Sequence, residues 1–377
     1  MKQEKQTELL GLDLGELSDL VAKKGQPSYR AQQLFHGLYR QRAQTVEQVS
    51  TLPQEFRQEI ANSGFCVGLP AIDRKFVSRD GTVRYLMSFP DGQSVETVWM
   101  PEGDDGEKGD GSEADDQLET SGVRDWQRAT ICVSSQVGCA VDCQFCLTAL
   151  LGVKRNLSPG EIVGQVATVL NDQQVSPPRD RVNLVFMGMG EPFLNYANFM
   201  KAVRLLVQGV EIPESRMTVS TAGIVPKIYE FGKEPIRPKL AISLNASNDE
   251  LRTRLMPLNR KWNLEKLMAA ARDFPLRARE RLTFEYVLLD GVNESEQNAR
   301  EVVELIRGIR AKVNLIALNP GPGLPFRTPA ENSVFQFQSI LAVAGIPAFI
   351  RRPRGRDIYA ACGQLKRTIE LEPLSAT

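Results

Sequence analysis

Residues 129–146 read ATICVSSQVGCAVDCQFC, and this stretch decides how the rest of the chain is interpreted. It begins with a short run of apolar and β-branched residues, Ala129–Ser134, which predicts a buried strand. Three cysteines follow at Cys139, Cys143 and Cys146. In parallel α/β barrels, chemically active side chains lie at the carboxyl ends of the strands. The stretch therefore predicts a strand of such a sheet that leads directly into a functional loop.

Strands and helices alternate over most of the chain beyond this stretch. Each predicted strand is a short apolar run bounded by turn residues, and each predicted helix carries apolar residues at helical spacing. The predicted strands are Ala129–Ser134, Val182–Met187, Met217–Ser220, Leu240–Leu244, Leu282–Leu288 and Val313–Ala317, and the helices include Glu161–Leu170, Tyr196–Val207, Leu264–Phe274, Glu296–Ile309 and Ser333–Val343. This alternation predicts an α/β fold with a parallel sheet, arranged as a partial barrel of six strand–helix units.

Two units of different character precede this core, which we assign to residues 126–367 with a tail at 368–377. Residues 1–62 predict a helical accessory domain, with helices over Leu9–Ala22, Tyr29–Arg40 and Leu52–Ile60. Residues 63–101 predict a small antiparallel β extension, with strands over Lys75–Ser78, Thr82–Ser88 and Ser94–Met100 separated by Asp-Gly turns. Residues 102–125 connect this extension to the core.

This connection is strongly acidic. Residues 102–125 carry ten acidic and two basic side chains, whereas the whole chain has 46 of each sign and is neutral. The other residues hold 44 bases and 36 acids, and this mildly basic balance permits a nucleic-acid partner. Because the connection is rich in Gly and Ser and has few apolar side chains, we expect it to be a disordered loop.

Composition excludes several classes of protein. The 377 residues are 42% hydrophobic and 24% charged, which is typical of a globular protein. No apolar run approaches the ~18 residues of a membrane span, and the polar N-terminus does not resemble a signal peptide, so we expect a cytoplasmic protein. The single histidine, His36, excludes sites that need two histidines, and no nucleophile-elbow sequence accompanies it.

The cysteines are the strongest chemical signal. Three thiolates on one loop can bind one face of a [4Fe–4S] cluster and leave one iron open to a small molecule, because such a cluster normally has four protein ligands. A zinc site that lacks its fourth ligand is the alternative. Cys132 and Cys362 lie elsewhere in the chain, and on their own they would be interpreted as inert buried cysteines. Cys66 keeps that interpretation.

The C-x3-C-x2-C spacing, with an aromatic residue before the last cysteine, resembles the radical S-adenosylmethionine (SAM) superfamily. Seven further stretches resemble the RNA adenine-C2 methyltransferases within it, over about residues 9–367; they are SSQVGC at 134–139, RNL at 155–157, MGMGEP at 187–192, STAG at 220–223, AISL at 241–244, NP at 319–320 and ACGQL at 361–365. The resemblance implies a radical SAM enzyme with a [4Fe–4S] cluster on Cys139, Cys143 and Cys146. It also implies two SAM molecules per turnover, 23S rRNA and tRNA as substrates, and an electron donor such as a flavodoxin-type reductant. We expect a monomer with no membrane partner.

The resemblance also implies a role for each site residue. Its SAM contacts correspond to Gly190, Glu191, Ser220, Ser243, Leu244, Asn245 and Asn319. A carboxylate such as Glu191 can face the SAM ammonium group, and glycine allows close approach of the backbone. Cys362 corresponds to the residue that becomes S-methylcysteine, and Cys132 to the resolving thiol that forms a transient disulfide with it.

Three positions need separate comment. Glu96 corresponds to the proton acceptor, although strand alternation alone favours a solvent-facing side chain there. The sequence has Asn245 where the family usually has histidine, and Ala222 where it often has serine. Because Asn245 can still make a hydrogen bond, we expect SAM binding to be retained.

Three other functions remain open from the sequence. A Cfr-type adenine-C8 methyltransferase of 23S rRNA shares the cysteine arrangement. A non-catalytic iron–sulfur RNA-binding protein would need neither the SAM positions nor Cys362. A zinc-stabilised α/β protein would need only the cysteine loop. Product analysis, assay of 5′-deoxyadenosine and metal analysis would distinguish these functions.

Overall fold

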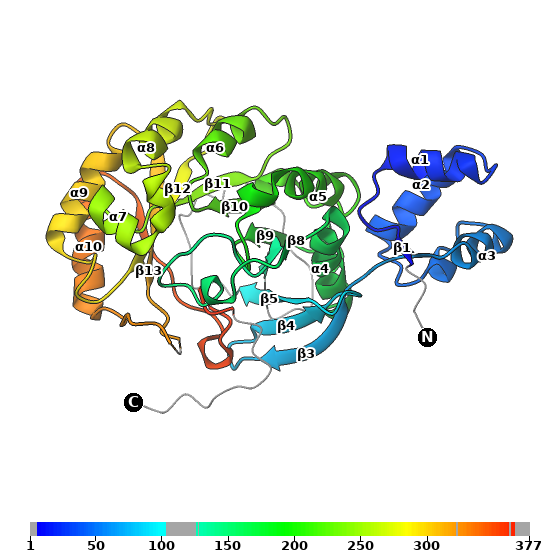
Figure 1. Cartoon of the computed structure of the whole chain (residues 1–377), viewed down its shortest axis with the longest axis horizontal. Coiled ribbons are helices and arrows are strands. Elements are labelled where there is room, and N and C mark those ends of the chain that lie inside the picture. Colours follow the sequence, from blue (N-terminus) through cyan, green and yellow to red (C-terminus); the bar gives the residue numbers. More distant parts are fainter. Residues whose placement is uncertain (1–5, 103–125, 127, 322, 362, 366–377) are drawn as a thin grey trace.

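The fold is built on one large sheet (Figure 1). The computed structural model describes residues 6–102, 126, 128–321, 323–361 and 363–365. Within them lies a ten-stranded sheet with the strand order β14-β13-β12-β11-β10-β9-β6-β5-β4-β3. The acidic connection beyond Glu102, the tail at 368–377 and Cys362 lie outside the described residues.

Seven strands of this sheet are parallel and form the core. They are β6 (Arg128–Cys132), β9 (Val182–Phe186), β10 (Met217–Thr221), β11 (Lys239–Ser243), β12 (Leu282–Leu288), β13 (Ala311–Ala317) and β14 (Ala348–Ile350). The helices are α4 (Pro159–Asp172), α5 (Tyr196–Gln208), α6 (Val225–Gly232), α7 (Asp249–Leu255), α8 (Leu264–Asp273), α9 (Glu296–Ile306) and α10 (Glu331–Val343). Figure 1 shows α5 to α10 in an arc outside the strands. The predicted α/β fold is therefore confirmed, including all six predicted strands.

Local sequence explains where these helices begin. At α4 the Ser158 hydroxyl accepts a hydrogen bond from the Glu161 backbone, and the Glu161 carboxylate accepts one from the Ser158 backbone. Pro159 occupies the first helical position, where its missing N–H has no cost. Because β6 and α4 frame the cysteine loop, this capping fixes the point at which the loop ends.

The antiparallel meander belongs to the same sheet as the core. Its strands are β3 (Ala71–Val77), β4 (Val83–Ser88) and β5 (Ser94–Glu102). Strand β5 pairs antiparallel with β6, with Val98 opposite Cys132. The predicted β extension is thus continuous with the parallel strands, and β5 lies inside the sheet rather than at an edge.

The N-terminal unit is helical, with α1 (Leu14–Lys23), α2 (Tyr29–Phe35) and α3 (Gln54–Asn62), and a two-stranded sheet of β1 (Thr7–Glu8) and β2 (Phe65–Cys66). In Figure 1 it lies beside α4 and α5. The unit meets the core where Gly11 and Gly160 approach each other closely. A Cβ on Gly160 would lie 2.2 Å from the Leu10 carbonyl oxygen, so no larger residue fits there. Arg42 completes the junction by donating to Asn171 Oδ1 at 2.9 Å.

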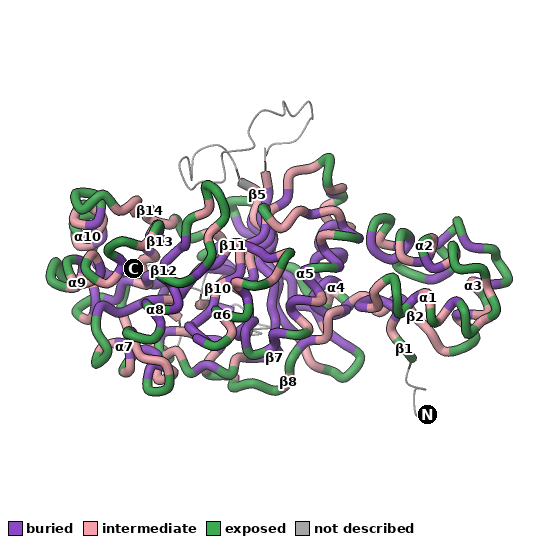
Figure 2. Tube along the Cα trace, turned by 90° about the horizontal axis from the view of Figure 1, so that it is seen from above, coloured by how far each residue is buried: buried purple, intermediate pink, exposed green. Residues whose placement is uncertain are grey.

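The buried side chains follow this architecture. Figure 2 shows them concentrated on the central strands and the inner faces of the helices, with exposed residues on the outer turns. One continuous apolar core joins the N-terminal unit, the meander and the parallel strands. Among the described helices, none combines the length and the apolar character that a membrane crossing requires.

Candidate active site

The three predicted cluster ligands lie on one loop between two short strands, β7 (Gln136–Val137) and β8 (Arg155–Asn156), which pair with each other. A Cβ on Gly138 would lie 1.8 Å from the Gly152 carbonyl oxygen, so the neck of this loop requires glycine. The Cys146 N–H donates to the Cys143 carbonyl at 3.1 Å, and the Val141 N–H points to Cys139 Sγ at 3.4 Å. Backbone bonds within the loop therefore turn it back on itself.

The cysteines share an apolar environment and act on one another. Cys139 and Cys143 pack against a small buried cluster that includes Phe145, Leu255 and Met256. Burial raises the pKa of Cys139 to about 12, and Glu191 and Cys146 add to the shift. Burial is also the main reason that the pKa of Cys143 lies well above its ordinary value. Charge repulsion from Cys146 and Cys139 raises this pKa further. The raised pKa values of Cys139 and Cys143 mean that these two thiols need a nearby cationic group to become thiolates.

The donor set of three thiols is of the kind that holds an iron–sulfur cluster. Among the described histidine, cysteine and acidic side chains, none form a group of three disposed to bind one metal ion. A [4Fe–4S] cluster does not need such convergence, because each thiolate binds a different iron. The residues present thus suit the cluster that the sequence predicts.

Glu191 lies at the end of the strand next to this loop. It follows β9, and its buried carboxylate accepts hydrogen bonds from the Phe193 and Ala222 backbone at 3.0 and 2.7 Å. Complete burial raises its pKa to about 7, although these hydrogen bonds oppose the shift. Gly190 before it has φ of 99°, and a Cβ there would lie 2.6 Å from the Gln136 Cβ. A buried carboxylate in this position is suited to a cationic ligand.

The other predicted SAM positions lie at neighbouring strand ends. Ser220 is the next-to-last residue of β10 and Ser243 ends β11, and their hydroxyl oxygens are 3.3 Å apart. Asn319 is buried just beyond β13. Since adjacent parallel strands end at one edge, these residues line one rim of the barrel.

Asn245, at the same rim, is engaged by the protein itself. It has a left-handed φ of 56°, its Oδ1 accepts from the Val287 backbone at 2.9 Å, and its Nδ2 points to Met256 Sδ at 3.4 Å. Its side chain joins the end of β11 to β12. Leu244 before it is fully buried.

A buried arginine that the sequence did not single out joins these strand ends. Arg252 in α7 donates to the carbonyl oxygens of Ala222 at 2.8 Å, Ser243 at 3.1 Å and Leu244 at 3.1 Å. Burial lowers its pKa to about 10, although the nearby Cys143 and Asp249 oppose the shift. Arg252 therefore fixes the backbone of the predicted SAM site and puts a positive charge beside the cysteine loop.

Glu96 is completely buried, which contradicts the solvent-facing position that strand alternation favours. Its Oε1 accepts from Arg84 Nη1 at 2.6 Å, and Arg84 is buried to the same extent. The Ser134 hydroxyl donates to the Glu96 carbonyl at 2.6 Å and accepts from the Met189 N–H at 2.9 Å. These bonds link Glu96 to the start of the cysteine loop and to the strand end that precedes Glu191.

Of the two cysteines outside the loop that are predicted to react, the structure describes only Cys132. Cys132 is buried at the carboxyl end of β6. Cys362 lies outside the described residues, but its neighbours contact the cysteine loop. The Leu147 N–H donates to the Gly363 carbonyl at 2.8 Å, and the Thr148 hydroxyl donates to the Leu365 carbonyl at 2.7 Å. Both donors directly follow Cys146 in the sequence.

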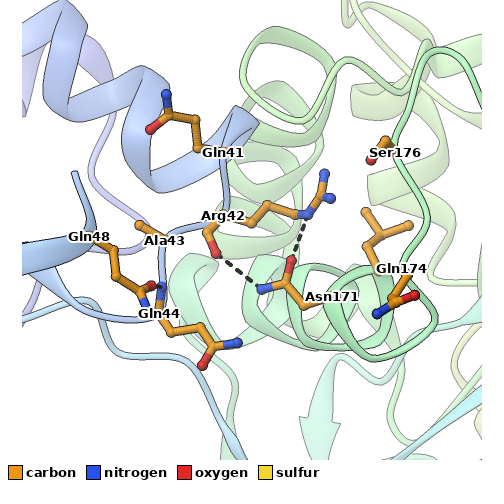
Figure 3. A pocket seen from close by; sticks show the side chains of 9 residues that line it. Gln41, Arg42, Ala43, Gln44, Gln48, Asn171, Gln174 and Ser176 are labelled. Atoms are coloured by element: carbon orange, nitrogen blue, oxygen red, sulfur yellow. Dashed lines mark hydrogen bonds between the residues drawn. The ribbon is translucent and has the colours of Figure 1, made fainter. Parts of the chain in front are cut away.

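One cavity lies elsewhere, at the junction of the N-terminal unit and α4 (Figure 3). It has a volume of about 450 Å³ and is lined mainly by amide side chains around Arg42 and Asn171. Arg42 Nε donates to Asn171 Oδ1, and Asn171 Nδ2 donates back to the Arg42 carbonyl at 3.0 Å. None of the predicted site residues lines it, so it is separate from the strand-end site.

Comparison with known proteins first defines the class. The Radical SAM superfamily matches residues 133–303, and the ribosomal RNA large subunit methyltransferase N-terminal domain matches residues 7–65. A radical SAM methyltransferase from Sphaerobacter thermophilus has a similar structure, with a TM-score of 0.85 and 42% identity over 96% of this chain and 100% of that one. The chain is thus a radical SAM protein with an N-terminal domain, a class whose cofactors are an iron–sulfur cluster and SAM.

Curated relatives define the family. A probable dual-specificity RNA methyltransferase RlmN of Koribacter versatilis is 66% identical over 355 residues, which cover 94% of this chain and 100% of the relative. The dual-specificity RNA methyltransferase RlmN of a Nitratiruptor species is 42% identical over 90% of this chain and 93% of the relative. The chain belongs to the RlmN family of dual-specificity RNA methyltransferases.

Proposed function

We propose that this protein methylates C2 of adenosine in 23S rRNA and tRNA by radical chemistry, with Cys362 as the methyl carrier. One observation carries the proposal beyond family membership. The carbonyls of Gly363 and Leu365 accept hydrogen bonds from Leu147 and Thr148, the two residues after the proposed ligand Cys146. The described residues that follow position 362 are therefore held next to the loop that would bind the cluster.

Cys139, Cys143 and Cys146 would hold a [4Fe–4S] cluster and leave its fourth iron for SAM. A cluster bound there would supply the electron for cleavage of SAM to methionine and a 5′-deoxyadenosyl radical, and would be the acceptor for the electron released after the carbon–carbon bond forms. SAM would bind at the rim formed by the strand ends, in contact with Glu191, Ser220, Ser243 and Asn319. The backbone of this rim would be shaped by Gly190, Leu244 and Asn245. The Glu191 carboxylate would face the SAM ammonium group.

The chain's own residues then move the methyl group. The Cys362 thiolate displaces S-adenosylhomocysteine from a first SAM and becomes S-methylcysteine. The radical from a second SAM takes a hydrogen atom from this methyl group, and the resulting methylene radical adds to C2 of adenine. After one electron leaves, Glu96 accepts the C2 proton. The Cys132 thiolate attacks the Cys362 sulfur, which gives a disulfide, and the released carbon takes up a proton to become the methyl product.

The environment of Glu96 supports its role as the proton acceptor. An arginine stays protonated under all ordinary conditions, so Arg84 at 2.6 Å favours the ionised form of the carboxylate. An ionised carboxylate can accept a proton, whereas a buried carboxyl without a cation would be protonated already.

We further propose a cytoplasmic monomer that receives electrons from a flavodoxin-type protein. The target base must be unstacked to reach a buried site, and looped RNA offers such a base at the lowest cost. The basic stretch at 351–356 and the N-terminal helices would contact phosphates.

The test of this function separates the two thiols. Cys362→Ala should abolish RNA methylation while iron still binds. Cys132→Ala should still attack adenine and then stall as a covalent protein–RNA adduct, visible as a shifted band on a denaturing gel that collapses with ribonuclease. A purely structural pair of cysteines gives no adduct in either variant. Normal turnover by Cys132→Ala, or an adduct from Cys362→Ala, would show that the roles are wrongly assigned.

The adenine-C8 methyltransferases remain the second candidate, because the cysteine arrangement does not separate the two reactions. A digest of the modified RNA distinguishes them directly. We expect 2-methyladenosine, and 8-methyladenosine as the main product would contradict the proposal.

A further inference from the structure

The turn between β3 and β4 is hydrogen-bonded to the segment that precedes Cys362 in the sequence. We call the described residues 355–361 and 363–365 the carrier loop. The Ser78 hydroxyl donates to Asp357 Oδ1 at 2.5 Å, and the Arg79 N–H donates to its Oδ2 at 3.3 Å. In the opposite direction, the Gly355 N–H donates to Asp80 Oδ2 at 2.9 Å. Figure 1 shows the C-terminal segment beside this turn, although the bonded residues Asp80 and Gly355 are 275 positions apart in sequence.

The other end of the carrier loop is attached to the cysteine loop. Gly363 and Leu365 accept the hydrogen bonds from Leu147 and Thr148 described above, and Gln364 Nε2 donates to the Pro320 carbonyl at 2.9 Å. Cys362 itself is outside the described residues. The described residues on both sides of it are therefore held by two separate parts of the protein, the β3–β4 turn and the cysteine loop.

The first attachment is tight. Gly355 has a left-handed φ of 58°, and a Cβ there would lie 2.8 Å from the Ala360 Cβ and 2.9 Å from the Thr82 Cγ2. Tyr359 adopts a left-handed φ of 52° without being glycine. Such a conformation is strained in a residue other than glycine and persists only where the surroundings impose it.

The carboxylates of Asp80 and Asp357 each accept two hydrogen bonds. Asp80 Oδ1 accepts from the Thr82 backbone at 2.9 Å while its Oδ2 holds Gly355. Partial burial alone would raise the pKa of Asp80, but the hydrogen bonds from Gly355 and Thr82 outweigh it and keep the pKa below its usual value. The Asp80 carboxylate is thus hydrogen-bonded as an anion, which makes its bonds stronger than those of a neutral amide.

We propose that Asp80 and Asp357 are positioning residues that clamp the carrier loop, so that the methyl group on Cys362 stays within reach of the radical. The inference rests on the proposed function. Hydrogen transfer to a radical requires close approach, and a displacement of about 1 Å can cost about a hundredfold in rate. The clamp belongs to the same meander that carries Glu96 and Arg84, so one rigid sheet positions both the proton acceptor and the methyl carrier.

A loosened clamp has a specific consequence. The radical would still form but would react elsewhere before it met the methyl group. We expect SAM cleavage to continue while RNA methylation falls, so the ratio of 5′-deoxyadenosine to methyladenosine should rise at least threefold. A change that merely lowered stability would reduce both products together and leave this ratio unchanged.

The variants are Asp357→Asn and Asp80→Asn, each of which removes a negative charge, converts one acceptor oxygen into a donor and so weakens the hydrogen bonding of the clamp. Ser78→Ala removes a single bond and serves if either variant fails to fold. Asp73→Asn is the matched control, because Asp73 accepts a bond of the same kind from the Ser88 hydroxyl at 2.7 Å, at the opposite end of the same hairpin.

Two readouts test the clamp. In protein without cofactors, hydrogen exchange of the peptide covering 351–365 should accelerate in Asp357→Asn and Asp80→Asn and stay unchanged in Asp73→Asn. In the loaded enzyme, the product ratio should rise in the same two variants only. Unchanged exchange and ratio in both clamp variants, or equal changes in the control, would overturn the inference. If the unmodified protein itself cleaves no SAM, the proposed function fails instead.

Discussion

Replacing Glu96 tests the buried ion pair and the proposed reaction in one series of variants. Both Glu96 and Arg84 are fully buried, and Arg84 Nη1 is 2.6 Å from the carboxylate. Within the described residues, Arg84 Nε and Nη2 have no hydrogen-bond partner, and the guanidinium lies 4.2 Å over the Phe76 ring. Glu96→Ala therefore leaves a buried cation with the aromatic face as its main remaining contact.

The expected cost follows from this geometry. Removing one partner of a buried ion pair typically costs about 3–5 kcal/mol, and we expect Glu96→Ala to fall in that range. Glu96→Gln keeps an acceptor oxygen for Arg84, and a hydrogen bond to a charged group contributes about 1.5–3 kcal/mol, so its cost should be smaller by about that amount. Replacing both residues, as Arg84→Met with Glu96→Leu, removes both charges and should lie within about 1 kcal/mol of the unmodified protein.

Urea unfolding of the cofactor-free protein, followed by tryptophan fluorescence, measures these differences, because Trp99 lies on the same strand as Glu96. All variants at Glu96 should lose RNA methylation, including the double variant whose stability recovers. Equal destabilisation by Glu96→Ala and by the double variant would refute the energetic coupling. Native methylation by Glu96→Gln would refute the role as proton acceptor.

Three further predictions concern the rim and the cysteine loop. Changing Cys139, Cys143 or Cys146 to Ala should abolish SAM cleavage and sharply lower the iron content of anaerobically reconstituted protein; native cleavage by any one of them would exclude that ligand. The pKa of Glu191 is raised from 4.5 to about 7 in the fold, so folding favours its protonated form, and cofactor-free protein should lose up to about 3 kcal/mol of stability between pH 4.5 and 7. Glu191→Gln should flatten this dependence in urea titrations, and an unchanged slope would contradict it. Arg252→Met should weaken SAM binding at least tenfold in equilibrium dialysis, because three carbonyls lose a charged donor worth about 1.5–3 kcal/mol each; native affinity would argue against that role.

The parallel core could be predicted from the sequence because its strands are buried on both faces and so appear as short apolar runs. Local signals also explain where predicted boundaries were wrong. The helix predicted over Leu9–Ala22 begins only at Leu14, where the Asp13 side chain caps it. The helix predicted to Ile309 ends at Ile306, because Gly308 adopts a left-handed φ of 79°. Strand β14 was missed because three residues are too short for a periodic pattern.

The site was predictable only where its residues lie in recognisable stretches. The cysteines and strand-end positions come from such stretches. Arg84, Arg252 and Asp357 do not, because their importance depends on partners brought together by folding. Alternation was misleading for Glu96 because it assumes a strand with one wet face, whereas β5 is an internal strand of the ten-stranded sheet.

The antiparallel pairing of β5 with β6 has a consequence for how this chain can change. Val98 opposite Cys132 fixes where Glu96 and Ser134 meet, and this register does not depend on how many residues connect the two strands. The cost of closing a connection grows only slowly with its length. Insertions between Glu102 and Trp126 should therefore accumulate during evolution without moving the site, and the same place should accept a fluorescent reporter or an affinity tag.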